Sequence, residues 1–123
     1  MQEFLDYILD HYQRPRRRGR MEEADVVLKG GNPGCGDVVV IYLRRNSDGT
    51  LSVSFTGEGC AVSQACASIV CEEADGKTPE EIMDLNHTFL EERIGPDILR
   101  SRLRCATLAL DTLKAAVSNL KTS

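Results

Sequence analysis

Five cysteines are the residues of this chain best suited to chemistry, and three of them stand in distinctive local sequences. Cys35 lies between two glycines in NPGCGD (residues 32–37), two positions before Asp37, and Cys60 follows Gly-Glu-Gly where a helix is expected to start. Cys105 begins the last apolar stripe of the chain. Thiolates bind Zn²⁺ and iron–sulfur clusters, and a carboxylate is a harder and weaker additional ligand. The sequence therefore predicts a four-ligand site made of Cys35, Asp37, Cys60 and Cys105, suited to holding its ligand transiently.

The local sequence favours accessible, reactive thiols at the first two of these cysteines. Pro33 restricts one backbone angle, while Gly34 and Gly36 allow conformations closed to other residues, so a ligand can approach Cys35 closely. Free N–H groups and partial positive charge at a helix N-terminus favour the thiolate form of Cys60. The alternative for NPGCGD is an ordinary tight turn with an incidental cysteine.

The other two cysteines are expected to be structural. Cys66 falls on the apolar stripe of the helix that Cys60 opens, so it points well away from Cys60 and into the core. Cys71 returns to the angular face of Cys60, but it lies about 16 Å further along the helix axis, too far to share one metal. We expect Cys71 to be structural or partly exposed.

Composition and length limit the classes of protein to which this chain can belong. An odd number of cysteines without a secretion signal fits the reducing cytosol better than a disulfide framework, so the expected location is cytoplasmic. The net charge of −4 gives no electrostatic case for binding nucleic acid. No apolar run approaches the roughly 20 residues of a membrane span. A length of 123 residues suits one domain, 1–123, and is too short for two ordinary ones.

Hydrophobic periodicity predicts an α+β fold, with a small three-stranded antiparallel sheet and helices packed on one face. The expected strands are 24–28, 38–43 and 51–56, and the last two are joined as a hairpin by the turn 46–49. The expected helices are 4–12, one from Cys60, one capped by Thr78 and one over 106–120. Gly57 and Gly59 are expected to break the third strand before Cys60. A helix could start near Cys105 or run on continuously from Pro96, because no glycine or proline interrupts that interval.

A run of basic residues follows the first predicted helix, which Pro15 ends. Its members are Arg14, Arg16, Arg17, Arg18 and Arg20. Such a run is typical of a solvated, mobile segment, and the alternative is a docking patch for an acidic partner.

Four stretches of the chain resemble the iron–sulfur cluster assembly scaffolds of the IscU, SufU and NifU N-terminal type. They are YILDHYQRPRRRG (7–19), NPGCGD (32–37), FTGEGCAVSQACAS (55–68) and RCATLALDTL (104–113), in the family's order. The resemblance implies the family's α+β fold and its site of three cysteines and one aspartate, here Cys35, Asp37, Cys60 and Cys105. It also implies that the cysteines accept sulfur as a persulfide from a cysteine desulfurase. A labile [2Fe–2S] cluster is then assembled with iron and passed to recipient apo-proteins or carriers, and Zn²⁺ can occupy the same four residues.

Three departures separate the chain from individual branches of that family. IscU-type members carry a histidine just before the third cysteine, where this chain has Arg104. They also carry an LPPVK motif that a dedicated chaperone recognises, and ILRSR (98–102) stands in its place here, which argues against that chaperone as a partner. RCATLA is similar to the SufU branch, but the interval from Cys60 to Cys105 has no room for that branch's insertion. Arg102 or Arg104 could orient an anionic persulfide, or both could be ordinary surface arginines.

Three hypotheses follow for a protein that is a scaffold or sulfur acceptor rather than a conventional enzyme. The leading hypothesis is a scaffold that builds and transfers a [2Fe–2S] cluster. The alternative is a zinc-dependent persulfide acceptor that stimulates a cysteine desulfurase. A purely structural zinc domain is disfavoured, because the chain has no CxxC pair and both histidines, His11 and His87, lie outside the site motifs. The roles of Cys66, Cys71 and Arg104 stay open.

Overall fold

The computed structural model describes residues 2–32, 34 and 36–120, and a three-stranded antiparallel sheet lies at its centre. Strands β1 (Val26–Asn32), β2 (Asp37–Arg45) and β3 (Leu51–Glu58) are neighbours in chain order. Side chains alternate between the two faces of a strand, and the set that faces the helices is almost fully buried. This set includes Val39, Ile41, Leu43, Leu51, Val53 and Phe55.

Helices cover that buried face, as the sequence predicted. In the described chain they are α1 (Gln2–Gln13), α2 (Ala61–Ala74), α3 (Pro79–Met83), α4 (His87–Ile94), α5 (Pro96–Ser101) and α6 (Leu103–Ser118). Thr78 caps α3 in a capping box with Glu81, which confirms the cap predicted for this helix. The α+β fold is therefore confirmed.

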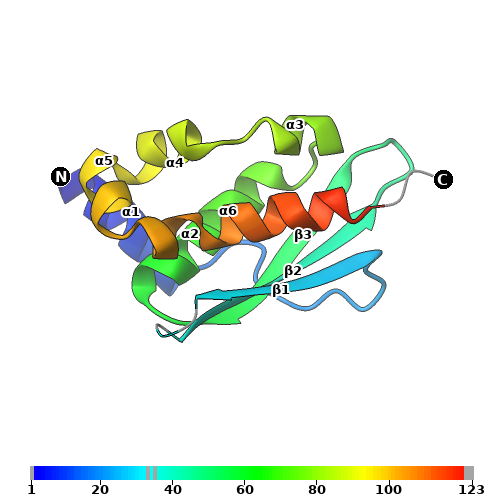
Figure 1. Ribbon diagram of the computed structural model, residues 1–123. Coiled ribbons are helices and arrows are strands. Elements are labelled where there is room, and N and C mark those ends of the chain that lie inside the picture. The colour runs from blue at the N-terminus through cyan, green and yellow to red at the C-terminus, as the bar shows by residue number, and fades with distance from the viewer. Residues whose placement is uncertain (1, 33, 35, 121–123) are drawn as a thin grey trace.

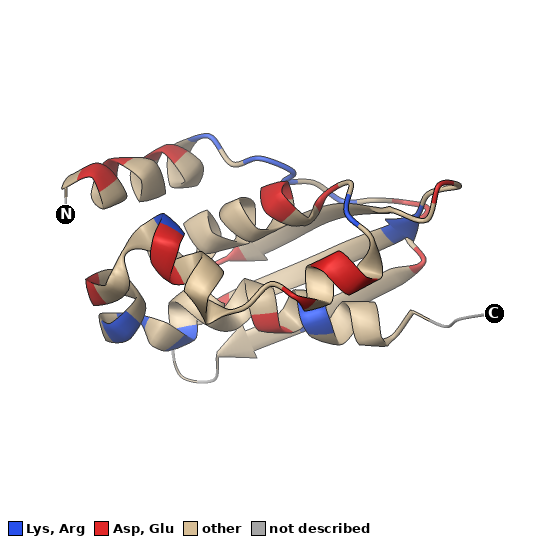
Figure 2. Ribbon diagram, turned by 90° about the horizontal axis from the view of Figure 1, so that it is seen from above, with Lys and Arg blue, Asp and Glu red and all other residues tan. Residues whose placement is uncertain are grey.

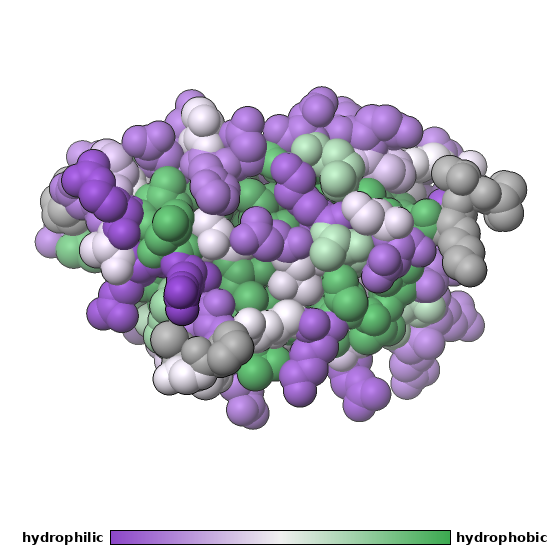
Figure 3. All heavy atoms as spheres, viewed as in Figure 1, coloured by the Kyte–Doolittle hydropathy of each residue, from purple (hydrophilic) through white to green (hydrophobic). Residues whose placement is uncertain are grey.

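The helices form two layers above the sheet. Figure 1 shows α2 and α6 lying across one face of the sheet, with α3, α4 and α5 above them. The main core fills the space between the sheet and these two helices, where Val70 of α2 and Leu110 and Leu113 of α6 are buried. The face seen in Figure 3 is mostly hydrophilic, and its hydrophobic side chains reach the surface in separate patches. None of the helices that the model describes is both long and apolar enough to cross a membrane.

Strand β1 begins and ends later than the predicted range 24–28. It runs from Val26 to Asn32 and pairs with β2 along its whole length, although it contains two adjacent glycines. Gly30 is required there because α6 crosses closely, and a Cβ atom at this position would collide with the side chain of Thr112. The long-range packing of α6 therefore explains why a glycine stands inside this strand.

The prediction that Gly57 breaks the third strand is wrong. Gly57 pairs with Val39 within β3, and the strand continues to Glu58. A side chain at Gly57 would collide with the carbonyl oxygen of Val38 and the side chain of Gln64, so glycine allows a close approach here rather than a chain break. Gly59, with a φ of +145°, does end the strand before α2 begins.

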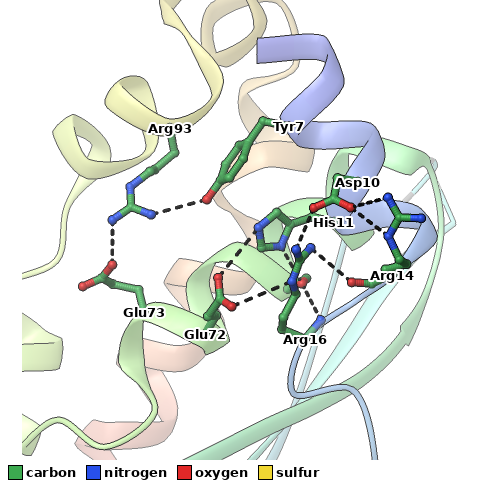
Figure 4. A network of polar contacts seen from close by, with 9 residues as sticks. Tyr7, Asp10, His11, Arg14, Arg16, Glu72, Glu73 and Arg93 are labelled. Carbon is green, nitrogen blue, oxygen red and sulfur yellow. Dashed lines mark hydrogen bonds and ion pairs between the residues drawn. The ribbon is translucent and has the colours of Figure 1, made fainter. Parts of the chain in front are cut away.

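A polar network fixes α1 against α2, and it absorbs the first part of the basic run (Figure 4). His11 is 1% exposed, and its Nδ1 lies 2.7 Å from Ser68 Oγ. Arg16 pairs with Asp10 at 2.6 Å and with Glu72 at 3.8 Å. Arg14 pairs with the same aspartate one helical turn away and is largely exposed, so Arg16, through Glu72 and through its backbone N–H to Ser68, is the arginine that attaches the end of α1 to α2.

The chain then crosses from one edge of the sheet towards the other. Gly19 donates a backbone hydrogen bond to the carbonyl of Phe55 on the outer edge of β3, and Asp25 donates one to the carbonyl of Leu43 in β2. The segment 19–25 therefore passes over the sheet face that the helices leave uncovered. Figure 2 shows the basic residues gathered along the segment that follows α1.

Candidate metal centre

Three of the four predicted ligands meet at one end of the sheet. Asp37 is the first residue of β2, Cys60 immediately precedes α2, and Cys105 lies in the first turn of α6. One ligand atom from each residue, a carboxylate oxygen or a sulfur, lies within 4.8 Å of the others. Two sulfurs bound to one zinc ion lie about 3.8 Å apart in tetrahedral geometry, so this spacing suits one metal ion or a small cluster.

Asp37 is the buried member of the group, at 2% exposure. Its Oδ1 accepts hydrogen bonds from the backbone N–H of Cys60 at 2.9 Å and from the hydroxyl of Ser63 at 3.3 Å. Its Oδ2 accepts from the thiol of Cys105 at 3.1 Å and from the Asn32 amide at 3.4 Å. The carboxylate thus joins the starts of β2, α2 and α6.

Cys60 is the N-cap residue of α2, as its place after Gly-Glu-Gly predicted. Its sulfur accepts a hydrogen bond from the backbone N–H of Ser63 at 3.4 Å, in the manner of a capping side chain. Gly59 precedes it with a positive φ, and a Cβ atom there would collide with the carboxylate of Asp37. The glycine thus lets the chain turn into α2 while Asp37 packs directly beneath it.

Cys105 stands near a helix N-terminus, which settles the alternative left open by the sequence. Helix α5 ends at Ser101, Arg102 adopts a non-helical conformation (φ −127°, ψ 39°), and α6 begins at Leu103. The helices are therefore separate, and the second one carries Cys105 on its first turn.

Burial and hydrogen bonding set the protonation states at this site. Burial acts to raise the pKa of Asp37, but the hydrogen bonds from Cys60, Cys105, Asn32 and Ser63 outweigh it and hold the pKa below its ordinary value. Burial, followed by the neighbouring Asp37 and Cys60, raises the pKa of Cys105 to about 12. A bound cation reverses this balance, because it favours the thiolate over the thiol.

None of the other three cysteines is a described member of this site. Cys35, the fourth predicted ligand, lies outside the described residues. Cys66 and Cys71 are fully buried, and each packs within a hydrophobic cluster, which confirms a structural position for both. Burial raises the pKa of the Cys66 thiol to about 12 and raises that of Cys71 as well. Neither thiol is available as a ligand.

Two supporting residues, Ser63 and Asn32, were not foreseen from the sequence. Ser63 is 2% exposed and donates its hydroxyl to Asp37. Asn32 donates to Asp37 and also to the backbone carbonyl of Arg104 at 3.2 Å, so it joins the end of β1 to the start of α6. The asparagine of NPGCGD and the serine three positions after Cys60 were visible signals, but only the folded chain shows that both point to one carboxylate.

An apolar groove of about 440 Å³ borders the site. Leu5 and Leu9 of α1, each nearly half exposed, form one wall, and Val62 of α2 and Ile98 of α5 line it as well. Arg102, at the break between α5 and α6, also lines the groove, and the side chain of Arg104 is exposed.

In this α+β fold, a buried carboxylate at the start of β2 meets two thiols at the starts of α2 and α6, and this arrangement defines a class of protein that can bind a metal ion or a metal–sulfur cluster. The chain belongs to the NifU-like N-terminal domain family, whose model matches residues 3–123. It is 35% identical over 114 residues to the iron–sulfur cluster assembly scaffold protein IscU 1 of Archaeoglobus fulgidus, covering 93% of this chain and 74% of that one.

Two further comparisons represent the SufU branch. The zinc-dependent sulfurtransferase SufU of Bacillus subtilis is 28% identical over 132 residues, with 94% of this chain and 89% of that protein covered. The crystal structure of a protein assigned as the iron–sulfur cluster assembly scaffold of a SUF system, from Fervidobacterium islandicum, superposes with a TM-score of 0.74. That structure is 29% identical in sequence, and the match covers 91% of this chain and 94% of that one. These findings confirm the predicted family.

Proposed function

We propose that this protein is a scaffold on which a labile [2Fe–2S] cluster is assembled and then transferred to recipient proteins. The observation that carries the proposal is the convergence of Asp37, Cys60 and Cys105, whose ligand atoms lie within 4.8 Å of one another in a member of this family. With Cys35 as the fourth ligand, the site presents three thiolates and one carboxylate. The cluster is the cargo of the protein and not a resident cofactor.

Sulfur reaches the site as a persulfide from a cysteine desulfurase in the cytosol. A thiolate of the scaffold attacks the outer sulfur of the donor persulfide, so a new S–S bond forms, the donor's S–S bond breaks, and the donor cysteine leaves as a thiolate. No net oxidation occurs in this exchange. Each transferred sulfur is then reduced to sulfide by two electrons from an external thiol reductant before two sulfides join two iron ions.

The position of Asp37 suits transient holding. A carboxylate oxygen is a harder ligand than a thiolate and binds iron or zinc less firmly in a thiolate site. Here the two oxygens of the Asp37 carboxylate also accept from four protein donors, two each, which stabilise the carboxylate when the cargo has left. The exposed apolar groove beside Cys60 provides surface on which a second protein could contact the site.

A second candidate function is that of a zinc-dependent sulfur acceptor, favoured by the similarity to the sulfurtransferase SufU. The donor set fits zinc, because thiolates and a carboxylate within 4.8 Å of one another match the ligands and spacing of tetrahedral sites. Cys35, Asp37, Cys60 and Cys105 would hold the ion, and zinc would keep the thiolates deprotonated and protected. Displacement of one thiolate by the approaching desulfurase would free it to accept sulfur.

The first experiment is anaerobic reconstitution with ferrous iron, cysteine, a cysteine desulfurase and dithiothreitol. We expect visible absorbance of a [2Fe–2S] cluster in the wild type and its loss in Cys35→Ala, Cys60→Ala and Cys105→Ala. Cys71→Ala is the matched control, because that thiol is buried in the core and lies outside the site. A folded wild-type protein that forms no cluster would refute the scaffold function.

The variant Asp37→Ala separates the two functions. In a scaffold, replacing the weak ligand slows transfer of the cluster to a recipient apo-ferredoxin, so the loaded protein holds its cluster longer. In a zinc protein, loss of one of four ligands weakens zinc binding, which competition with a chromophoric chelator measures. Tight zinc in the purified protein, strong stimulation of the desulfurase and no stable cluster would select the second function.

A further inference from the structure

A cavity of about 280 Å³ lies on the sheet face opposite the helices, away from the candidate metal centre. The segment that crosses this face forms one side of the cavity, and the outward side chains of β2 and β3 form its floor. Six of its lining residues carry the chemistry: Arg17, Arg18, Arg20, Arg44, Ser52 and Ser54. No aspartate or glutamate is among the described residues that line it.

The arginines of this cavity differ in how far they are already engaged. Arg17 donates to the carbonyl of Val53 at 2.9 Å and pairs with Asp75 at 3.3 Å. Among the described residues, the partner of the Arg18 side chain is the carbonyl of Gly57, at 3.3 Å. The side chains of Arg20 and Arg44 make no hydrogen bond or ion pair with any residue that the model describes, and both are exposed. Several guanidinium donors therefore face the cavity without an acidic partner.

Ser54 indicates a binding site here independently of the arginines. Its side chain projects from β3 to the outer face, is 7% exposed and lines the cavity, yet its hydroxyl has no hydrogen-bond partner among the described residues. A buried hydroxyl without a partner is costly. Beside it, Ser52 is paired across the sheet with Arg44, but its hydroxyl already donates to Oδ1 of Asn46 at 3.1 Å, so Ser54 is the serine left to donate to a ligand.

We propose that this cavity is a binding site for a phosphate group, supplied either as free inorganic pyrophosphate or as the phosphate end of a nucleotide. Planar guanidinium groups donate in pairs to the oxygens of phosphate, and the unpartnered hydroxyl of Ser54 adds a further donor. An acidic peptide fits less well. The edge of β3 beside the cavity is already paired with the backbone of residues 17–19, so an extended peptide cannot add to the sheet there.

Binding is tested by titrating the apo-protein with pyrophosphate and, separately, with adenosine triphosphate without added metal ions. Amide chemical shifts from NMR report the position, and isothermal titration calorimetry reports the affinity. We expect shifts confined to residues 17–21, 44 and 52–54, and weaker binding as ionic strength rises. Similar affinities for the two probes would identify the phosphate group alone as the ligand, and tighter binding of the nucleotide would identify the nucleotide. A glutamate-rich peptide that binds in place of either probe would overturn the proposal.

Three arginine variants separate a built site from general attraction by positive charge. Arg20→Gln and Arg44→Gln each remove a charge at the cavity, and each should weaken pyrophosphate binding about tenfold, as expected for a lost charge-assisted hydrogen bond. Arg100→Gln removes the same charge from exposed α5 and should leave the affinity unchanged. Equal weakening by all three would show nonspecific attraction and refute the site.

Ser54→Ala provides a readout that charge alone cannot produce. The substitution removes a hydroxyl that lacks a partner, so the unliganded protein should melt at the same or a higher temperature, while pyrophosphate binding weakens several-fold. Unchanged binding in this variant would contradict the assigned role of Ser54. Because none of these residues belongs to the candidate metal centre, cluster assembly in the variants should be intact, and either proposal can fail without the other.

Discussion

Gly59 is the position where a single methyl group should damage the candidate metal centre most directly. In the variant Gly59→Ala, the new Cβ would collide with Oδ1 of Asp37 and would lie 2.9 Å from the Ser63 hydroxyl oxygen. The backbone φ of +145° is itself unfavourable for a residue with a side chain. The substitution therefore combines a backbone penalty with displacement of the buried carboxylate.

The two contributions can be estimated separately. A non-glycine residue at positive φ costs about 1–2 kcal/mol. Displacing Asp37 weakens its hydrogen bonds to the Cys60 N–H and the Ser63 hydroxyl, and losing the equivalent of one hydrogen bond to a charged group costs about 1.5–3 kcal/mol. We expect a total loss of about 2.5–5 kcal/mol in the free energy of unfolding, together with a weaker metal site.

Gly49→Ala is the matched control for the backbone term. Gly49 also has a positive φ, +89°, but a Cβ atom there would meet nothing within 4 Å. Urea denaturation of the apo-proteins should give a loss of about 1–2 kcal/mol for the control, and zinc affinity should fall only in Gly59→Ala. Equal stability losses in the two variants, with zinc affinity unchanged in both, would refute the steric argument.

Three further predictions concern the stability of the fold. Burial lowers the pKa of His11 from its ordinary value of 6.5, so the unfolded chain takes up this proton more readily than the folded one. Stability should therefore be full above pH 6.5 and fall below it, and urea denaturation should show this loss in the wild type and not in His11→Gln. Thr78→Ala removes the cap of α3 and should cost about 1 kcal/mol, measured by thermal denaturation; an unchanged melting temperature would contradict the role of the capping box. Gly30→Ala should cost about 1–3 kcal/mol through collision with Thr112, and the second substitution Thr112→Ala should recover part of it. Additive losses in that double variant would argue against the contact.

Local signals in the sequence were sufficient for most of the elements. The apolar run of β2, the alternation in β3 and the cap at Thr78 each depend on neighbours within a few residues, and all were predicted correctly. Cys60 was placed correctly at a helix start because two glycines precede it.

Long-range packing decided the features that the sequence left open or misplaced. The glycines at positions 30 and 57 suggest breaks when considered alone, but α6 and the side chain of Gln64 approach them closely in the fold. The break at Arg102 has no glycine or proline to mark it. The donors that surround Asp37 come from β1, α2 and α6, and no local pattern brings Asn32 and Ser63 together.

The basic run illustrates the same limit within one short motif. Arg16 holds the end of α1 against α2 through Glu72, and Arg14 pairs locally with Asp10, whereas Arg18 and Arg20 face the cavity on the outer side of the sheet. The two hypotheses from the sequence, a solvated segment and a docking patch, treated this run as one unit. Tertiary structure divides it into a structural half and a half that is available to a ligand.

The metal-binding residues lie far apart in the sequence, so binding of the cargo affects how rigid the protein is. Asp37 and Cys105 are 68 positions apart, so whatever binds to both acts as a reversible cross-link that closes most of the polypeptide into a loop. A ligand that binds only the folded chain adds about 2.7 kcal/mol of stability at one hundred times its dissociation constant. Delivery of the cargo removes this constraint, so the emptied protein is the looser of its two forms, and its resistance to unfolding or proteolysis reports whether the site is loaded.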